Sequence, residues 1–413
     1  MPIKKRSVSK VDIKDNPLFD FDNFFISEEM DVNVNENSFE VNHETIVESR
    51  EKDTTSNTPS SGPYLPRSTF AYTESELING TDGPVEVKYN IPATPQQDYE
   101  LQMWDKLNSF EMNSWSDSQK GLKTGMPKID EAFDGGLKSG FVVIAADSNI
   151  GKTCVMSQIA WNIAELNEEA YVMDFSLDDP LQDKLSRVIG CSGKVLINAV
   201  KNPKGYLEYP LMLARRAQTL NKLRARVDRY QAFDATDGTD IEVIEEKIKR
   251  MAIELEAQGK DKRLVVFIDN LHDLTIASQP SLVGKEKYDV IAQWCADLAI
   301  QYNIPLVCTA EMKKINGDRR PILDDIRECV KIKYEAKAII LVYNEVHYKG
   351  ESSEIFFNRN GHMMKQPVLE LHFAKNKISS FKGRLFYEFY PELSRLEEPD
   401  EDSIRRYAGL VYS

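Results

Sequence analysis

The sequence has few of the features that mark secreted, zinc-binding or membrane-spanning proteins. It contains only five cysteines in 413 residues, none of them in CxxC spacing, so it predicts neither a disulfide framework nor a zinc site. The longest apolar runs, residues 141–146 and 338–343, have the length of strands and are too short to cross a membrane. The basic N-terminus has no apolar run behind it, so we expect no secretory signal and a reducing, cytoplasmic setting.

An excess of basic residues is also lacking. Asp and Glu number 66 against 52 Lys and Arg, which gives a net charge of −14, and this balance argues against nucleic-acid binding by the chain as a whole. The acidity is uneven, because residues 1–100 hold 19 Asp and Glu but only 9 Lys and Arg. The remainder therefore carries a net charge of only about −4, and a basic surface there becomes a local question.

Composition and periodicity divide the chain into three parts. Residues 1–95 are rich in Asn, Ser, Thr, Asp and Glu without a sustained period, which predicts a disordered acidic tail. Within residues 96–120, apolar side chains recur at helical spacing, which predicts one amphipathic helix that either packs on its own domain or links it to a neighbour. Residues 121–413 are expected to form one large α/β domain.

Short apolar runs alternate with helical stretches through this domain. Continuous apolar strands between helices predict a mainly parallel sheet covered by helices on both faces, and the last two runs predict an antiparallel extension. The expected strands are residues 141–146, 170–176, 264–268, 304–309, 338–343, 368–373 and 384–389. The expected helices are residues 152–166, 211–229, 242–258 and 288–302.

The most specific motif lies between the first of these strands and the first helix. Residues 146–153 read ADSNIGKT, which is the arrangement of a P-loop with Ala at the first glycine position. The backbone N–H groups of such a loop surround the β- and γ-phosphates of a nucleotide, the lysine supplies a cation, and the threonine hydroxyl ligates Mg²⁺. The predicted phosphate-binding residues are Asp147, Ser148, Asn149, Ile150, Gly151, Lys152 and Thr153.

Two strand ends supply carboxylates for the same site. Asp269 closes the apolar run 264–268 and is the predicted Walker B ligand of Mg²⁺. Asp178, just beyond the strand 170–176, is the predicted residue that activates or orients water, because ligands bind at the carboxyl ends of parallel strands. Asp179 competes for that role, but it precedes Pro180 and is expected to cap the following helix.

An ordered series of motifs resembles the motor domain of DnaB-type replicative helicases, which has a RecA-like fold. The series runs through the P-loop and covers roughly residues 120–392. Its members are TGMPKID at 124–130, GGL at 135–137, FSLD at 175–178, PLVCTAEMKK at 305–314, RPILDDIRECV at 320–330, EAKA at 335–338 and AKNK at 374–377. The tail before residue 95 matches nothing in the family, and the helical N-terminal collar domain of these helicases is not recognisable.

The resemblance implies roles for further residues. Glu311 stands where the family has a glutamine that senses the γ-phosphate, and Asp178 stands at the place of the catalytic glutamate. Lys375 and Lys377 would act on the nucleotide of a neighbouring subunit, so that the site is complete only in a ring. Arg384 is a possible substitute for these trans-acting cations, with a structural role as the alternative. Because Asp178 is shorter than Glu and Glu311 adds a charge, these departures leave the rate of hydrolysis in question.

The resemblance also turns the local charge into a prediction of DNA binding. A ring that moves on single-stranded DNA needs cations on the loops that line its channel. The predicted DNA-facing residues are Lys313, Lys314, Arg319, Arg320, Arg327 and Glu328.

The implied protein is an ATP- and Mg²⁺-dependent replicative helicase that assembles as a ring, expected to be a hexamer. Its tail would recruit primase, a helicase loader or other replication proteins. An ATP-binding ring or adaptor with little hydrolysis stays open as the alternative, and a recombinase or KaiC-like ATPase of the same fold as a third.

Overall fold

The computed structural model describes residues 64–71, 85–92, 97–114, 120–259, 262–314, 319–328, 330–358 and 364–412. The chain divides into two compact units, which meet in the sequence between Trp115 and Ser116, and each unit is described by itself.

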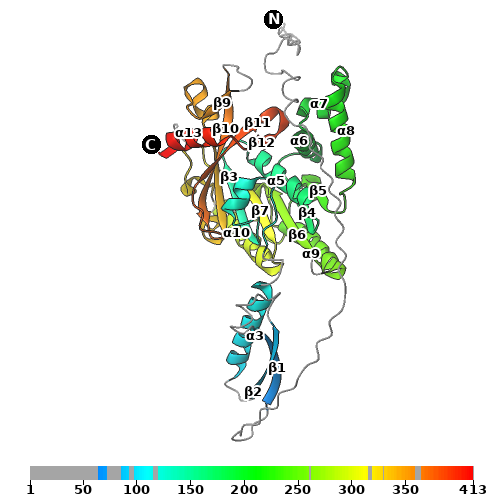
Figure 1. Ribbon diagram of the computed structural model, residues 1–413, viewed down its shortest axis with the longest axis vertical. Helices are drawn as coiled ribbons and strands as arrows, with labels where there is room; N and C mark the ends of the chain where they lie inside the picture. The colour runs from blue at the N-terminus through cyan, green and yellow to red at the C-terminus, as the bar shows by residue number, and fades with distance from the viewer. Residues whose placement is uncertain are drawn as a thin grey trace, which may run out of the picture. The chain divides into compact units, whose positions relative to one another are not determined.

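The first unit contains two strands and a helix. Strands β1 (Tyr64–Ala71) and β2 (Val85–Pro92) pair antiparallel, and helix α3 (Gln97–Ser114) contacts β1 (Figure 1). The expected helix is therefore present. The prediction of a disordered tail is wrong for the two strands: apolar residues alternate with polar ones from Val85 to Ile91, the period of a strand, although the region's overall composition is polar. Residues 1–63 lie outside the described residues.

The second unit is built on a long mixed sheet with strand order β12-β11-β10-β8-β3-β7-β6-β4-β5, and β9 pairs with β10. The run from β8 to β5 is parallel, whereas β9, β10, β11 and β12 are antiparallel, as predicted. The strands are β3 (Gly140–Ala146), β4 (Ala170–Ser176), β5 (Tyr230–Asp234), β6 (Arg263–Asp269), β7 (Pro305–Glu311), β8 (Ala338–Asn344), β9 (Phe356–Asn358), β10 (Lys365–Asn376), β11 (Arg384–Tyr390) and β12 (Arg395–Glu397).

Helices connect and cover these strands. The longer ones are α5 (Lys152–Leu166), α6 (Leu181–Gly193), α8 (Pro210–Arg224), α9 (Ile241–Gln258), α10 (Gly284–Gln301) and α13 (Glu401–Tyr412). The short ones are α4 (Pro127–Ala132), α7 (Ile197–Lys201), α11 (Ile332–Glu335) and α12 (Glu345–Lys349), with 3-10 turns η3 (Pro203–Tyr206), η4 (Ala235–Asp237), η5 (Leu271–Asp273), η6 (Leu323–Asp325), η7 (Gly350–Ser352) and η8 (Pro391–Leu393). No helix in the described parts of the chain combines the length and the apolar character needed to cross a membrane.

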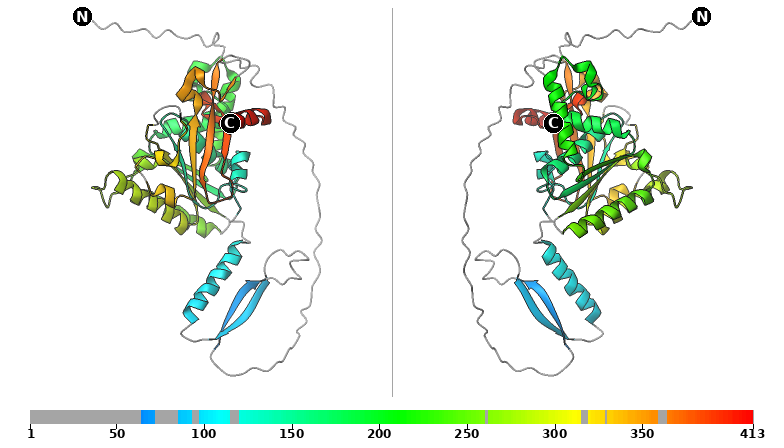
Figure 2. Two further views of the ribbon diagram at one scale, coloured as in Figure 1. Left: turned by 90° about the vertical axis from the view of Figure 1, so that its left-hand side faces the viewer. Right: turned by 90° about the vertical axis from the view of Figure 1, so that its right-hand side faces the viewer.

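Strand β3 shows why both faces of the sheet are covered. Its residues are all buried, and they alternate between two apolar clusters: Val142 and Ile144 pack in one with α5, while Phe141 and Val143 pack in the other with α9 and α10. In the turned views of Figure 2, α9 and α10 lie together on one side of the strands. This layering places the carboxyl ends of β3, β4, β6 and β7 at one edge of the sheet.

A buried ion pair anchors α6, which the sequence patterns did not predict. Lys184 of α6 lies 2.9 Å from Asp174 of β4, outside hydrogen-bond alignment, and both side chains are fully buried. Asp174 also accepts a hydrogen bond from the Tyr230 hydroxyl at 2.8 Å. This pair fixes the helix that follows the predicted catalytic aspartate.

Candidate active site

The phosphate loop connects β3 directly to α5. Asn149 and Gly151 have φ values of 61° and 121°, which glycine tolerates best. A Cβ on Gly151 would lie 3.0 Å from a methyl group of Leu369, so the loop is pressed against β10. No side chain caps the first turn of α5, and its N–H groups are therefore available to an anion. Lys152 at the helix start is buried, at 7% exposure, and Thr153 is half-buried.

Asp269 ends β6 with one oxygen bound and one unbound. The Thr309 hydroxyl donates a short hydrogen bond to Oδ1, whereas Oδ2 is buried without a hydrogen-bond partner among the described residues. A buried carboxylate oxygen left without a donor suits a hydrated cation. The described part of the chain holds no cluster of three metal-ligating side chains, which suits Mg²⁺ because this ion usually keeps waters and substrate phosphates as ligands.

Asp178 is held next to Asp269 by the backbone. The N–H groups of Leu177 and Asp178 donate to the Asp269 carbonyl oxygen at 2.5 and 3.2 Å. Partial burial raises the pKa of Asp178; the nearby carboxylates of Asp269 and Glu311 raise it further, and Lys152 opposes them. The predicted catalytic aspartate thus lies within electrostatic reach of the predicted phosphate and metal ligands.

Asp179 is occupied elsewhere. Its Oδ2 accepts a hydrogen bond from Arg187 at 2.8 Å, and the N-cap residue of α6 is Pro180. The expectation that Asp179 caps the helix is therefore wrong: the Leu181 N–H donates instead to Asp234, at the end of β5, at 2.9 Å. No hydrogen bond or ion pair engages the Asp178 carboxylate within the described residues, so Asp178 remains the better candidate for activating water.

Glu311, at the end of β7, meets a cation that the sequence patterns did not assign to it. Arg327 Nη1 lies 3.0 Å from Glu311 Oε2, and the Arg327 N–H donates to the Glu311 carbonyl oxygen at 3.0 Å. The charge that Glu311 adds near the phosphate loop is therefore balanced within the same subunit. Lys313 and Lys314, which were expected to compensate, are exposed.

Two residues after Asp269 complete the site and were not predicted. Burial raises the pKa of Asp273, and the charges of Asp178 and Glu311 add to this effect; its Oδ2 is buried without a partner among the described residues. His272 is buried and contacts both Glu311 and Arg327. The only signal in the sequence was their place directly after the Walker B strand, in the segment DNLHD.

The predicted DNA-facing residues fall into two groups. Arg319 binds both oxygens of Asp325, at 2.6 and 2.7 Å, and Arg327 pairs with Glu311. Glu328 is exposed and has a positive φ of 49°. Lys313 and Lys314 form no ion pair with a described residue, and they are the cations of this set that are open to solvent.

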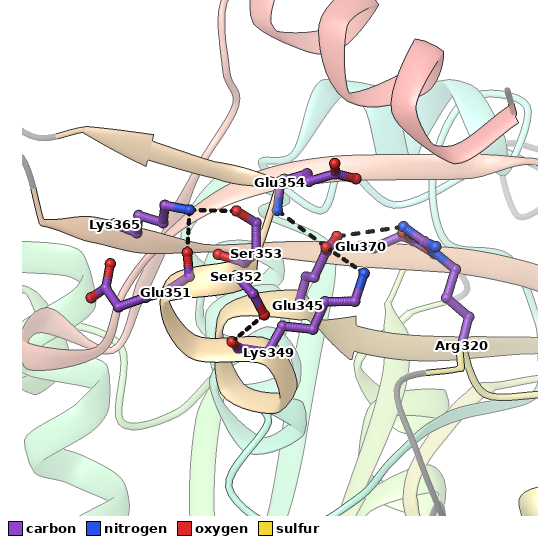
Figure 3. A network of polar contacts seen from close by, with 9 residues as sticks. All are labelled: Arg320, Glu345, Lys349, Glu351, Ser352, Ser353, Glu354, Lys365 and Glu370. Carbon is purple, nitrogen blue, oxygen red and sulfur yellow. Dashed lines mark hydrogen bonds and ion pairs between the residues drawn. The ribbon is translucent and has the colours of Figure 1, made fainter.

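Arg320 lies inside an ion-pair network, which argues against the predicted contact with DNA. Its Nε lies 2.8 Å from Glu370, and a terminal nitrogen lies 3.7 Å from Glu345. Figure 3 shows Arg320 reaching toward Glu370, with Glu345 and Lys349 beside it. The two carboxylates are almost fully buried, at 2% and 3% side-chain exposure, so Arg320 neutralises buried charge. Arg384 also hydrogen-bonds Glu370, in agreement with its structural alternative.

The predicted trans-acting lysines lie at the opposite edge of the sheet from the phosphate loop of their own chain. Asn376, between Lys375 and Lys377, pairs with Ala338 at the start of β8, whereas the loop follows the end of the parallel neighbour β3. A seven-residue strand separates these edges by about 20 Å. Neither lysine can therefore reach the nucleotide of its own subunit.

The two lysines differ in their surroundings. Lys375 Nζ donates to the carbonyl oxygens of Lys333 and Tyr334 at 2.6 and 2.8 Å. Burial lowers the pKa of Lys375, and the charge of Lys377 adds to the effect. The Lys377 side chain is exposed, which makes it the lysine that a neighbouring molecule can meet.

A buried phosphate loop, an adjacent strand-end aspartate and a mainly parallel sheet together define a P-loop ATPase domain. The family model of the DnaB-like helicase C-terminal domain matches residues 121–395. The chain therefore belongs to the DnaB-like helicase family.

Known structures and sequences support this assignment. The fold is similar to a helicase-family ATPase domain solved on its own, with a TM-score of 0.59 and 20% identity over 75% of this chain and all of that one. A DnaB-like replicative helicase solved in a study of its interactions with primase gives a TM-score of 0.58 at 18% identity, over 79% of this chain and 71% of the other. The predicted RecA-like fold is confirmed.

Curated relatives match over the same part of the chain. A probable replicative DNA helicase of Trieres chinensis is 25% identical over 237 residues, which cover 56% of this chain and 49% of the relative. A probable plasmid replicative DNA helicase of Chlamydia psittaci is 26% identical over 250 residues, 59% of this chain and 51% of the relative. The chain spans about half the length of the curated relatives it matches.

Proposed function

We propose that this protein is an ATP-driven motor that moves along single-stranded DNA as a ring of identical subunits and separates DNA strands during replication. The observation that carries the proposal is the group formed by Lys152, Asp269 and Asp178, in which the Asp178 carboxylate has no competing partner among the described residues while Asp179 is held by Arg187. Family membership over residues 121–395 supports the same function.

The residues divide the chemistry as follows. ATP with Mg²⁺ supplies the phosphoryl group that is transferred to water. The backbone of residues 147–151 and the start of α5 would hold the phosphates, Lys152 would balance their charge, and Thr153 and Asp269 would hold the metal ion. Asp178 would accept a proton from the attacking water or orient it, and Glu311 would respond to the loss of the γ-phosphate.

The placement of the lysines supports a ring. Because Lys375 and Lys377 cannot reach the nucleotide of their own chain, a role in hydrolysis requires a neighbouring subunit, with exposed Lys377 as the principal contact. Single-stranded DNA would meet Lys313 and Lys314. Primase, a loader or other replication proteins would bind the tail, in the cytoplasm of a bacterium or of a phage-infected cell.

Purified full-length protein tests the proposal through its ATPase rate with and without single-stranded DNA. We expect a basal rate that DNA stimulates and that Lys152→Ala abolishes, whereas Lys249→Ala, at an exposed position of α9, leaves both rates unchanged. A wild-type protein that binds ATP tightly but hydrolyses almost none would favour the alternative, an ATP-binding ring or adaptor. A rate that single-stranded DNA leaves unchanged at every salt concentration would refute the motor.

A further inference from the structure

His272 occupies a fixed position between the metal-site strand and two other elements. It lies in η5, three residues beyond Asp269, and is 9% exposed. Its backbone N–H donates to the side chain of Asn270 at 2.7 Å, and its ring packs 4.8 Å from the ring of Tyr288. Backbone and ring are therefore both held, and the direction of the imidazole nitrogens is set by the fold.

Each imidazole nitrogen meets a backbone group of a different element. The Glu311 N–H, at the end of β7, lies 3.2 Å from Nδ1, and the Arg327 carbonyl oxygen lies 3.1 Å from Nε2. Because an N–H only donates and a carbonyl oxygen only accepts, both contacts are satisfied by the neutral tautomer with its proton on Nε2. One side chain thus joins the sensor position to the segment 319–328.

The two elements are also joined directly. Arg327 and Glu311 share the backbone hydrogen bond and the ion pair described above, and Met312 forms a bridge with Ile326. A displacement of Glu311 would therefore move the Arg327 backbone, provided that His272 keeps the two in register. A unit of this kind can carry a change at the nucleotide to a distant loop, because its contacts form one connected set.

We propose that His272 is a positioning residue that transmits the nucleotide state from the Asp269–Glu311 side of the site to the segment 319–328. The proposal rests on the proposed function, because it assigns to that segment a response to ATP that DNA binding would use. His272 itself touches neither the nucleotide nor the DNA in this scheme. Its contribution is to hold the Glu311 amide and the Arg327 carbonyl in fixed relation.

The test compares His272→Phe with His272→Gln. Phenylalanine keeps a ring but neither hydrogen bond, whereas glutamine offers one acceptor and one donor. We expect His272→Phe to keep its basal ATPase rate while the stimulation by single-stranded DNA falls about fivefold or more, the lower range of coupling between linked sites. His272→Gln should restore most of the stimulation. His372→Phe, a substitution of a half-buried histidine on β10, is the control and should leave the stimulation intact.

A second measurement does not depend on DNA. Hydrogen–deuterium exchange of peptides that span residues 319–328 is followed in the full-length protein with and without Mg²⁺ and a slowly hydrolysed ATP analogue. We expect the nucleotide to change the exchange in the wild type and in His272→Gln, and to have no effect in His272→Phe. If that variant does not fold, His272→Asn replaces it, because its shorter amide cannot span both contacts.

The outcomes separate the two proposals. A wild type that hydrolyses ATP without stimulation by DNA refutes the motor, and the exchange measurement then decides on His272 alone. A 319–328 segment that ignores nucleotide in the wild type overturns the role of His272 even where DNA stimulates hydrolysis. Basal and stimulated rates that fall together in His272→Phe, or a His272→Gln variant as defective as His272→Phe, show that the ring only supports the fold.

Discussion

Arg327 and Glu311 form an ion pair in which Nη1 and Oε2 are 3.0 Å apart, and this pair neutralises a carboxylate beside the phosphate loop. Glu311 contributes to the electrostatic environment of Asp178 and Asp273, so its charge acts on the site directly. An anionic nucleotide would meet that charge unless Arg327 balanced it. The pair thus links the affinity for nucleotide to the segment that is the candidate for DNA contact.

We therefore expect Arg327→Met to weaken ATP binding, because it leaves Glu311 uncompensated. Arg327 is about half exposed, so the loss should be modest, about two- to fivefold in the dissociation constant. A second change, Glu311→Gln, should restore the affinity, and the non-additivity of the pair can be measured by calorimetric titration of all four proteins. Strictly additive effects would show that the ion pair does not govern nucleotide affinity.

The aspartates that follow β4 give a matched test of the catalytic assignment. We expect Asp178→Asn to lower kcat by about 100-fold or more, the usual contribution of a positioned general base, while ATP still binds. Asp179→Asn breaks the bond to Arg187 and should change kcat only a few-fold. Single-turnover measurements with both variants decide the matter, and equal losses in the two would remove Asp178 from its assigned role.

The pH dependence of hydrolysis should report the same group. Partial burial raises the pKa of Asp178 above its ordinary value of 3.8, and the charged form is the one that accepts a proton. Activity is therefore present above the folded-state pKa of Asp178 and lost as the pH falls through it. We expect the acid limb of kcat/KM for the free protein to lie above pH 3.8 and to disappear from the residual activity of Asp178→Asn. A limb that persists unchanged would belong to another group.

Much of this site could be predicted from the sequence because its parts depend on local patterns. Apolar runs marked the seven main strands, and the position of Asp269 at the end of one run placed it at the carboxyl edge of the sheet. The partners of charged residues could not be predicted in this way. Asp179 and Arg187 share a helix end, but Arg320 meets Glu370 only because β10 returns antiparallel beside β8. Such pairings depend on tertiary contacts, which a one-dimensional charge count does not contain.

The cations of the predicted DNA interface can be sorted by the same reasoning. Lys313 and Lys314 are exposed, whereas Arg320 balances the almost fully buried Glu370 and Glu345. We expect the double variant Lys313→Ala/Lys314→Ala to bind single-stranded DNA more weakly and with a shallower salt dependence. Each lost phosphate contact should reduce the slope of log K against log salt by about 0.7, while the temperature of unfolding stays unchanged.

Arg320→Ala should give the opposite pattern. Its removal leaves carboxylates that Arg384 and Lys349 only partly compensate, so the free energy of unfolding should fall by about 1–3 kcal/mol, whereas the salt slope of DNA binding should stay at the wild-type value. Fluorescence anisotropy across a salt series, combined with denaturant unfolding of each variant, separates the two effects. If Arg320→Ala lowers the slope and leaves the stability intact, Arg320 must leave its network to bind phosphate, and its position beside Glu370 describes only the DNA-free state.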